Sequence, residues 1–464
     1  MKSLKNLLIS GREVLPLVEG GKGVAVSTCK TAGAWAAENA VGTISGVIPD
    51  VVDENGEIIP MEIKAKTRRE RFEEQIRHSI EGIISQAKVA HEIACGKGRI
   101  HINVLWEQGG AQQIITEALA GAKGLINGVT CGAGMPYKLA EIASSFKTFY
   151  YPIVSSGRAF KALWARAYKS YADFLGGVVY EDPWKAGGHI GLSNNDDPAV
   201  PQNPYERIVE LRRSMSAVGL EQTPIIIAGG VWYLREFQDY IDNPEVGPTA
   251  FQFGTRPLLT RESPVAKAWQ KALLTLKKGE IALQRFSPTG FMSSAIKNKF
   301  LTDLFDRSAT AMPYKDAPEG DFQIPLNTGA NKVYITAADK ERADGYIGAG
   351  RTVILKTNDD QVVFVTPKNQ EYIQRARSEC MGCISQCLFS GFCQSAENLS
   401  TGKTPDPRYF CIKDALYRAA HGGSVDDELI FVGDNATRFA TDPLFKDGAL
   451  PTVKEFIAKL LTGD

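Results

Sequence analysis

Short β-rich runs alternate with helical patterns along the first part of the chain, and this alternation restricts the possible folds more than any other feature. Several of the runs are continuously apolar, as expected for parallel strands covered on both faces. Eight β/α repeats over about 280 residues predict an α/β fold of the (β/α)8 TIM-barrel type, with an open doubly wound sheet as the alternative. The runs are VAVST (24–28), GTISGV (42–47), HINVLW (101–106), GLINGVT (124–130), YYPIVSS (150–156), GGVVYE (176–181), PIIIAGG (224–230) and AFQFGT (250–255).

The segments between these runs carry helical patterns. In 68–95 apolar residues recur at steps of three or four, and Gly96 follows as a predicted C-terminal cap. The segments 111–121 and 136–146 show the same pattern, and Pro136 fits a first helical turn. Such helices supply the crossovers that parallel strands need.

Composition and charge exclude several classes of function. The 464 residues include 53 basic and 53 acidic side chains, and this zero net charge gives no electrostatic case for binding nucleic acid or an anionic membrane. The longest apolar runs are strand-sized, so we expect no membrane span. The first sixteen residues lack the apolar core and cleavage site of a signal peptide, which predicts a cytoplasmic location. The oligomeric state stays open, with a homodimer as one outcome.

Two predicted strands end in glycine motifs that indicate a phosphate site. Gly229 and Gly230 end the seventh run, and Gly254 and Thr255 end the eighth. In barrels of this type the ends of the last two strands bind phosphate, because glycine lets backbone amides approach the oxygens and helix N-termini add a favourable dipole. One such cradle, without a second dinucleotide fingerprint, favours a ligand with a single phosphate-bearing nucleotide over a dinucleotide.

Five sequence motifs follow one another in a way that resembles one enzyme family. NVLW, AGGHIGL, PIIIAGGVW, FQFGTRPLLTRESP and SPTGFMSSAIKN have the order and spacing of the nitronate monooxygenases, formerly 2-nitropropane dioxygenases, a family that includes FMN-dependent enoyl-acyl-carrier-protein reductases. The resemblance covers about residues 20–300 and implies an FMN-bearing TIM barrel acting on a small-molecule substrate. It implies cofactor contacts at Thr28, Asn103, Gly188, Gly229, Gly230, Gly254 and Thr255.

The same resemblance implies that His189 is the catalytic acid or base at the substrate. Histidine titrates near neutral pH, where a general base works best, and the glycines around it let the loop lie close to flavin and substrate. We expect His189 to deprotonate a nitroalkane or to orient its anion; the alternative is a solvated loop histidine. The chain departs from the family pattern at VAVSTCKTAG, which predicts Cys29 and Lys30 near the flavin ring.

Five of the eight cysteines fall within 32 residues. Cys380, Cys383, Cys387 and Cys393 have the spacing C-x2-C-x3-C-x5-C, and Cys411 follows. In a reducing compartment this pattern favours a metal site over disulfides. The close spacing suits a [4Fe-4S] cluster better than the separated pairs of a zinc site, although zinc and free thiols stay open. We predict Cys380, Cys383, Cys387 and Cys393 as ligands, with Cys411 as the alternative fourth ligand; the first three resemble the cluster loop of flavin- and iron–sulfur-containing enoate reductases.

The chain divides into three predicted units. Residues 1–300 form the FMN-binding barrel, residues 301–370 form an insert, and residues 371–464 form a cysteine-cluster segment that packs on the barrel. Within the insert, two β-rich runs around Asn358-Asp359-Asp360 predict a β-hairpin.

Three functions fit these features. The first is an FMN-dependent oxidoreductase of nitronate monooxygenase type, which oxidises a nitronate or a similar carbanion-like substrate with molecular oxygen. The second is an NAD(P)H-dependent flavin or enoyl reductase with an iron–sulfur relay, and the third is a non-catalytic flavin and iron–sulfur redox sensor. The motif around His189 argues against the third, whereas the cysteine cluster raises the second.

Overall fold

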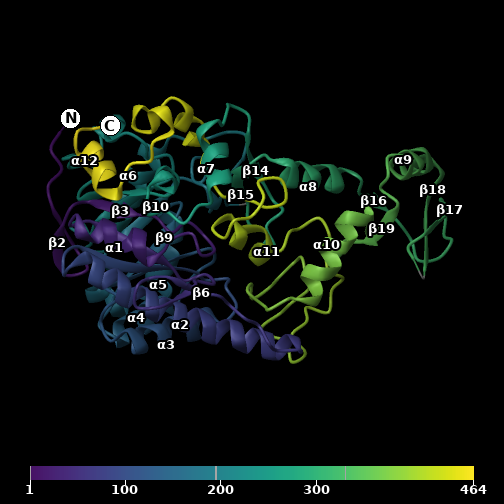
Figure 1. The fold of residues 1–464 in the computed structure, drawn as a ribbon, viewed down its shortest axis with the longest axis horizontal. Helices are drawn as coiled ribbons and strands as arrows, with labels where there is room; N and C mark the ends of the chain where they lie inside the picture. The colour runs from purple at the N-terminus through teal and green to yellow at the C-terminus, as the bar shows by residue number, and fades with distance from the viewer. Residues whose placement is uncertain (1, 194–195, 330) are drawn as a thin grey trace.

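Eight parallel strands form a closed barrel in the computed structural model, which describes residues 2–193, 196–329 and 331–464 (Figure 1). The strands follow one another around the barrel in chain order, and the last pairs with the first through Phe251 and Leu17. The TIM barrel is therefore confirmed, and the open sheet is excluded. The strands are β3 (Leu17–Glu19), β4 (Val41–Ser45), β7 (Arg99–Leu105), β8 (Gly128–Gly132), β9 (Phe149–Val154), β10 (Val178–Glu181), β12 (Ile225–Ala228) and β13 (Thr249–Phe253).

Helices cover the outside of the barrel. A helix from the end of the chain, α12 (Val453–Leu461), joins them by packing Phe456 against Trp35 and Phe253. The termini therefore lie close together (Figure 1). The other covering helices are α1 (Cys29–Ala37), α2 (Arg68–Ala94), α3 (Ala111–Ala122), α4 (Leu139–Ser145), α5 (Gly157–Arg166) and α6 (Pro204–Ser216), whereas α7 (Lys267–Leu274) packs on η5 (Asp434–Ala440).

Local sequence explains both ends of the longest helix, α2. Thr67 accepts a hydrogen bond from the backbone N–H of Glu70, whose carboxylate in turn accepts from the N–H of Thr67, so the two residues form a capping box. At the other end Cys95 and Gly96 have φ angles of 49° and 72°, which stops the helical hydrogen bonding. The predicted end at Gly96 is thus confirmed within one residue.

The prediction of a first barrel strand at 24–28 is wrong. This segment is a turn in which Ala25 has a φ of 54°, and the barrel strand is the three-residue β3 just upstream. The apolar side chains of Val24 and Ala25 are buried, but against the C-terminal half of the chain. Burial outside the barrel therefore produced the apolar pattern. The fourth strand also begins later than predicted, at Gly128, and α4 begins after Pro136, at Leu139.

Side chains from several of the strands form a buried cluster inside the barrel, among them Val18, Val41, Val179 and Ile226. The hairpin of β1 (Leu7–Ile9) and β2 (Arg12–Val14) adds Ile9 and Val14 to this cluster and closes the N-terminal end of the barrel. The open end is therefore the C-terminal one, where active sites of this fold lie.

The remaining strands form short antiparallel sheets outside the barrel. The predicted hairpin in the insert is present as β19 (Val353–Lys356) and β20 (Gln361–Val365), while the division of the chain at residues 300 and 370 stays a prediction. The pairs are β5 (Val51–Val52) with β6 (Ile58–Ile59), β15 (Ser293–Ile296) with β11 (Gly188–His189) and β14 (Ile281–Gln284), β20 (Gln361–Val365) with β16 (Met312–Pro313) and β19 (Val353–Lys356), and β17 (Phe322–Asn327) with β18 (Lys332–Thr336).

Further helices lie mainly in the second half of the chain. Figure 1 shows α8 leading from the barrel to an arm that carries α9 and projects away from the body. They are α8 (Lys299–Ala309), α9 (Ala337–Gly348), α10 (Pro367–Ser378), α11 (Ile412–Leu416) and the 3₁₀ helices η1 (Tyr168–Phe174), η2 (Leu234–Phe237), η3 (Arg256–Leu259), η4 (Tyr417–Ala419), η5 (Asp434–Ala440) and η6 (Pro443–Gly448).

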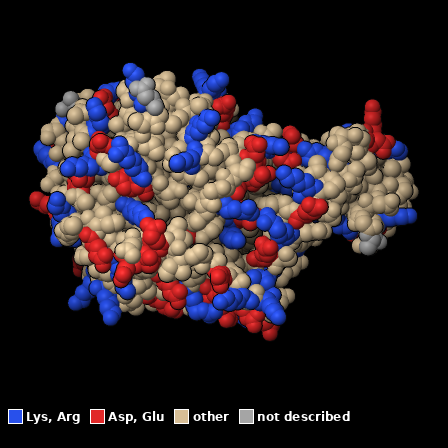
Figure 2. Space-filling view, in the orientation of Figure 1, with Lys and Arg blue, Asp and Glu red and all other residues tan. Residues whose placement is uncertain are grey.

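The surface agrees with the charge balance of the sequence. On the face shown in Figure 2, basic and acidic side chains are interspersed over the body and the arm. None of the helices in the described ranges combines the length and the apolar character that crossing a membrane requires.

Candidate functional site

A cavity of about 890 Å³ lies at the C-terminal ends of the barrel strands. A second cavity, of about 500 Å³, is continuous with it, because residues such as Gly21, Glu181 and Gly254 line both. We call the first the ring cavity and the second the phosphate cavity, after the parts of a flavin nucleotide that the family resemblance leads us to expect there. Together they form one elongated site across the mouth of the barrel.

The phosphate cavity brings together the four residues predicted to hold phosphate. Gly229 and Gly230 have φ angles of 86° and 77°, which glycine adopts without strain, and a side chain on Gly229 would approach Asp182 within 2.9 Å. Next to Gly254 there is open space on the side where a side chain would project. Thr255 lies beside it and accepts a hydrogen bond from Gly433 (3.0 Å). This bare backbone fits a phosphate group.

Asn103, the residue that the resemblance places at the flavin ring, lies on β7 and lines the ring cavity. A Cβ atom at residue 21 would lie 2.3 Å from the side chain of Asn103, so glycine at 21 is what gives the amide its room. Gln252 lines the same cavity from β13. No hydrogen bond from elsewhere in the described ranges engages either side-chain amide. Both amides are thus available to the polar edge of a flavin ring.

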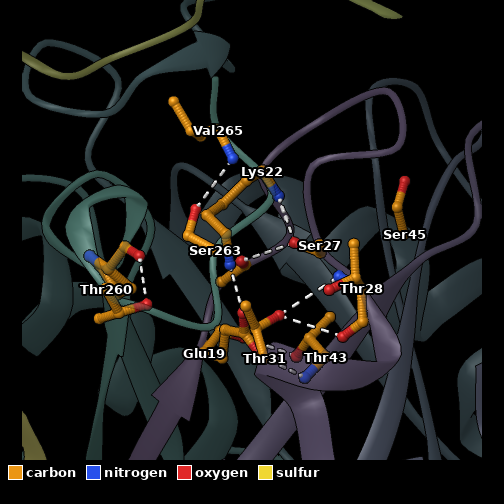
Figure 3. A network of polar contacts seen from close by, with 12 residues as sticks. Glu19, Lys22, Ser27, Thr28, Thr31, Thr43, Ser45, Thr260, Ser263 and Val265 are labelled. Carbon is orange, nitrogen blue, oxygen red and sulfur yellow. Dashed lines mark hydrogen bonds and ion pairs between the residues drawn. The ribbon is translucent and has the colours of Figure 1, made fainter. Parts of the chain in front are cut away.

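A buried ion pair on the cavity wall escaped the sequence analysis. Lys22 lines the ring cavity and pairs with Glu19 at the end of β3, and the two side chains are only 2% and 0% exposed (Figure 3). Glu19 also accepts a hydrogen bond from the backbone N–H of Thr43 (3.1 Å). The pair is therefore held in place, and its ammonium group favours an anionic group in the cavity.

The residues after the misassigned first strand lie elsewhere than predicted. Thr28 is the N-cap of α1, where its N–H donates to Thr31 (3.2 Å; Figure 3), and it lines neither cavity. Cys29 is buried against α2, with its N–H bonded to Gln86, and burial raises the pKa of its thiol to about 11. Lys30 pairs with Glu57 at the surface. The predictions that placed Thr28, Cys29 and Lys30 at the flavin are therefore not supported.

His189 lies on the wall between the ring cavity and a third cavity of about 1250 Å³, which we call the substrate cavity. The pairing of β11 with β15 fixes its backbone, and its Nε2 lies 2.5 Å from the hydroxyl of Ser287. The ring of Phe431 packs edge-on against the imidazole, with centroids 5.4 Å apart. Burial lowers the pKa of His189 to about 4, which contradicts the expectation of a little-perturbed value. The side chain is neutral at pH 7.

Glu181, at the end of β10, is a second titratable group that the sequence analysis missed. It lines the ring, phosphate and substrate cavities, and no hydrogen bond to its carboxyl group is formed within the described part of the chain. Burial, and to a smaller extent the neighbouring charge of Asp182, raises its pKa to about 8. Glu181 is therefore mostly protonated at pH 7. Paired groups with pKa values pushed in opposite directions are typical of acid–base sites.

The C-terminal part of the chain closes the site. Ile412, Leu416 and Phe431 line the ring cavity, and Asn435 donates to the carbonyl of Gly230 (2.6 Å) beside the phosphate cavity. A side chain on Gly187 would lie 2.6 Å from the backbone of Val432, so glycine there lets the histidine loop approach this segment. These contacts join parts of the chain about 200 residues apart, which explains why local motifs did not reveal them.

A buried polar cluster fastens this C-terminal segment to the phosphate cavity. Asp442 accepts hydrogen bonds from the side chains of Arg256 and Trp232, both at 2.9 Å. Arg256 directly follows Thr255 and also donates to the carbonyl of Trp232 (2.8 Å). Because the arginine and the aspartate are both almost fully buried, each depends on the other for compensation of its charge.

Four cysteines line a further cavity: Cys380, Cys383, Cys387 and Cys411. Cys393, the predicted fourth ligand, lies outside it. Its sulfur accepts a hydrogen bond from Gln386 (2.8 Å) and lies 3.0 Å from the hydroxyl of Ser395. Six residues after Cys387, at Cys393, the chain has already turned away from the cavity, whereas it returns to the cavity at Cys411, just before α11. The structure thus groups the alternative residue, Cys411, with the first three.

Comparison with solved structures supports the fold. The chain is similar to FabK from Thermotoga maritima (14% identity, TM-score 0.50, 97% of this chain and 92% of that one). It is also similar to the enoyl reductase domain of MlnA from the macrolactin cluster of Bacillus amyloliquefaciens (12% identity, TM-score 0.52, 97% and 94%). Nitroalkane oxidase from Streptomyces ansochromogenes matches over 62% of this chain and 78% of its own (16% identity, TM-score 0.42). A comparison with curated proteins gives no match.

Sequence comparison identifies the family directly. The model of the nitronate monooxygenase family matches residues 12–463, which includes the barrel, the insert and the cysteine segment. The barrel, with a site at the C-terminal ends of its strands that fits a flavin nucleotide, agrees with that match. The chain belongs to the nitronate monooxygenase family of FMN-dependent oxidoreductases.

Proposed function

We propose that this oxidoreductase oxidises a nitronate, or a similar carbanion-like small molecule, with molecular oxygen. The observation that carries the proposal is the position of His189 and Glu181, which both line the wall shared by the ring cavity and the substrate cavity. A neutral base and a neutral acid then face the place where a substrate would meet the flavin. Because the family consists of enzymes, the non-catalytic redox sensor is not retained.

The residues present fit FMN. In our assignment the backbone of Gly229, Gly230 and Gly254 and the hydroxyl of Thr255 hold the phosphate, and the Asn103 amide bonds the ring. The histidine loop approaches from the other side through Gly188, which has a φ of 77°. A single phosphate cavity supports a mononucleotide. FMN, when bound, supplies the electron acceptor for the substrate and passes electrons on to oxygen.

His189 is suited to take a proton from a neutral nitroalkane. The Ser287 hydroxyl can accept a hydrogen bond from Nε2–H, which leaves the lone pair on Nδ1 free for the proton next to the nitro group. The low pKa keeps the imidazole neutral and ready at physiological pH. Packing against Phe431 fixes the ring and helps to exclude water from the developing anion.

Glu181 is suited to the opposite task. As a protonated carboxylic acid it donates a hydrogen bond, and the oxygens of a nitronate are strong acceptors. Donation from a neutral acid holds the anion without placing a second negative charge beside it. The ammonium group of Lys22 adds positive potential on the same side of the ring cavity.

An anaerobic titration tests the proposal. The purified protein should release FMN on heating, and its flavin spectrum should bleach with a nitronate and return when oxygen is admitted. NADH and NADPH should bleach it more slowly. The proposal fails if the released flavin is FAD, or if a reduced nicotinamide bleaches the flavin while a panel of nitronates leaves it oxidised.

A Glu181→Gln variant should change the pH profile. Because the carboxyl group has a pKa of about 8, turnover in the wild type should fall as the pH rises through 8 and the acid loses its proton. Glutamine still donates a hydrogen bond but does not titrate, so the rate at pH 7 should stay within about tenfold and the alkaline fall should disappear. The measurement is kcat/KM from pH 6 to 10. The matched control is Glu210→Gln on the exposed face of α6, which should keep the fall; if Glu181→Gln keeps it too, Glu181 is not the acid.

A second candidate function is NAD(P)H-dependent reduction of an enoyl substrate. The observation that favours it is the size and lining of the substrate cavity, where apolar side chains such as Trp106, Met135 and Phe291 could accommodate an acyl chain. One of the structures that share the fold across almost the whole chain is an enoyl reductase domain. In the same titration this candidate requires rapid bleaching by NADH or NADPH, followed by reoxidation with an enoyl thioester.

A further inference from the structure

We propose that Cys380, Cys383, Cys387 and Cys411 bind a [4Fe-4S] cluster next to the flavin site. All four line one cavity, although three come from a loop after α10 and the fourth precedes α11. Thiolates from a tight loop plus one distant cysteine are the ligand set that such clusters use. The proposal does not depend on the substrate or on the direction of electron flow.

The cysteine loop is firmly attached to the catalytic end of the barrel. The backbone N–H of Gly109 donates to the carbonyl of Cys383 (3.1 Å), and that of Ser385 donates to the carbonyl of Glu107 (2.8 Å). Gly109 and Glu107 belong to the loop that follows β7. A Cβ atom on Gly109 would lie 2.0 Å from the carbonyl oxygen of Gly382, so the two backbones are in direct contact. A loop held in this way keeps its thiols in fixed positions.

Three basic side chains lie on or near the segments that form the cavity, where they can offset part of the charge of an anionic cluster. Arg71 of α2 donates to the carbonyl of Cys380 (3.1 Å), and Arg377 of α10 donates to that of Phe389 (2.9 Å). Lys413 lines the cavity itself. A cubane core with four thiolates carries net negative charge, so these cations offset the cost of burying it. Glu379 and Asp414 also line the cavity, and Asp414 pairs with Arg375 (2.9 Å).

The arrangement favours a cluster over a single zinc ion. Within the described ranges, no three or more His, Cys, Asp or Glu side chains gather closely enough to hold one metal ion. Zinc needs four ligands within about 2.3 Å of a single point. Four cysteines around one cavity instead supply the number of thiolates that a cubane takes, one for each of its separate iron corners. Cys393 is not among the ligands because it does not line this cavity; its sulfur contacts Gln386 and Ser395 instead.

The cysteine cavity and the flavin site share a wall. Ile412 lines both the cysteine cavity and the ring cavity, and it directly follows Cys411 in the chain. The Ile412 side chain is buried, so it forms part of the wall between the two cavities. A cluster here would be the immediate neighbour of the flavin.

The test is metal and sulfide analysis of the full-length protein, purified without oxygen and reconstituted with iron and sulfide. Wild-type protein should contain about four iron and four acid-labile sulfide per chain, and dithionite should produce an electron paramagnetic resonance signal of a reduced cluster. Cys411→Ser should lower iron and sulfide at least tenfold. The matched control Cys393→Ser should keep the wild-type content. Both variants should retain FMN, which shows that the barrel is folded.

Several results would overturn the proposal. One zinc per chain without sulfide in the wild type means a structural ion, and neither iron nor zinc means free thiols. Equal loss of iron in Cys393→Ser and Cys411→Ser contradicts the ligand set. If Cys411→Ser also loses FMN, Cys380→Ser, at the half-exposed edge of the cavity, must show the tenfold loss of iron with FMN retained. The readouts of iron and sulfide are independent of turnover, so they separate this proposal from the proposed function.

Discussion

Replacing His189 with alanine should lower the rate of flavin reduction by a neutral nitroalkane about 10²- to 10⁴-fold, while FMN remains bound. The loss follows from removing the base whose Nε2 is held by Ser287 and whose ring is packed against Phe431. The flavin contacts assigned to Asn103 and to the glycines of the phosphate cavity are untouched, so the flavin content should not change. Single-turnover reduction, followed at the flavin absorbance, measures this step directly.

The substrate's ionisation state separates two roles for the histidine. A preformed nitronate anion has already lost its proton, so it should suffer much less from His189→Ala than the neutral nitroalkane does. Equal losses on both substrates would mean that His189 orients the substrate and does not act as a base. The histidine has a pKa of about 4 and is therefore deprotonated from about pH 5 upwards, so its titration should cause no change in rate between pH 5 and 7. His91→Ala, on the exposed part of α2, is the matched control.

The parts of the site that could be predicted from the sequence are those with a local signal. Glycine pairs at the ends of β12 and β13 have a purely local cause, since the backbone needs positive φ at Gly229 and Gly230 and open space at Gly254. His189 also had a local signal, since glycines flank it in the motif AGGHIGL. The barrel itself followed from the alternation of apolar runs and amphipathic helices, which nearest-neighbour packing imposes on every repeat.

The sequence predictions failed at residues whose burial and position depend on distant parts of the chain. Val24 and Ala25 are buried by the C-terminal half of the chain and so imitate a strand, and this error moved the expected flavin contact to Thr28 when Lys22 was the residue at the cavity. Glu181 is the last residue of the predicted strand 176–181, and nothing in the local sequence marks it as a site residue. Only the closed barrel shows that it faces three cavities.

The cysteine spacing shows the same limit. Sequence proximity favoured Cys393 over Cys411 as the fourth ligand. In the structure Cys393 lies outside the cavity, whereas Cys411, at the start of α11, lines it. The return of the chain depends on where Ile412 and Leu416 pack, against the ring cavity. No local rule contains that information.

Asp442→Ala should lower the free energy of unfolding by about 3–5 kcal/mol, the usual effect of leaving a buried charge without its partner. The carboxylate receives hydrogen bonds from Arg256 and from Trp232, and both the carboxylate and the guanidinium are almost fully buried. Because Arg256 follows Thr255 directly, the loss should also weaken FMN binding, through movement of the strand end that lines the phosphate cavity. Chemical denaturation of the apoprotein and flavin titration measure the two effects.

A double variant tests whether the uncompensated charge of Arg256 causes the loss of stability in Asp442→Ala. In Asp442→Leu with Arg256→Met, both charges are gone and the volume is largely kept, so the double variant should recover a large part of the stability that Asp442→Ala loses. Asp434→Ala, an exposed carboxylate eight residues away on η5, is the control and should change stability by less than about 0.5 kcal/mol. If the double variant is less stable than Asp442→Ala, the aspartate matters for packing and hydrogen bonding of the C-terminal segment and not for compensating Arg256. In either case a loss of stability together with FMN would show that residues more than 180 positions beyond the last barrel strand end hold the flavin site together.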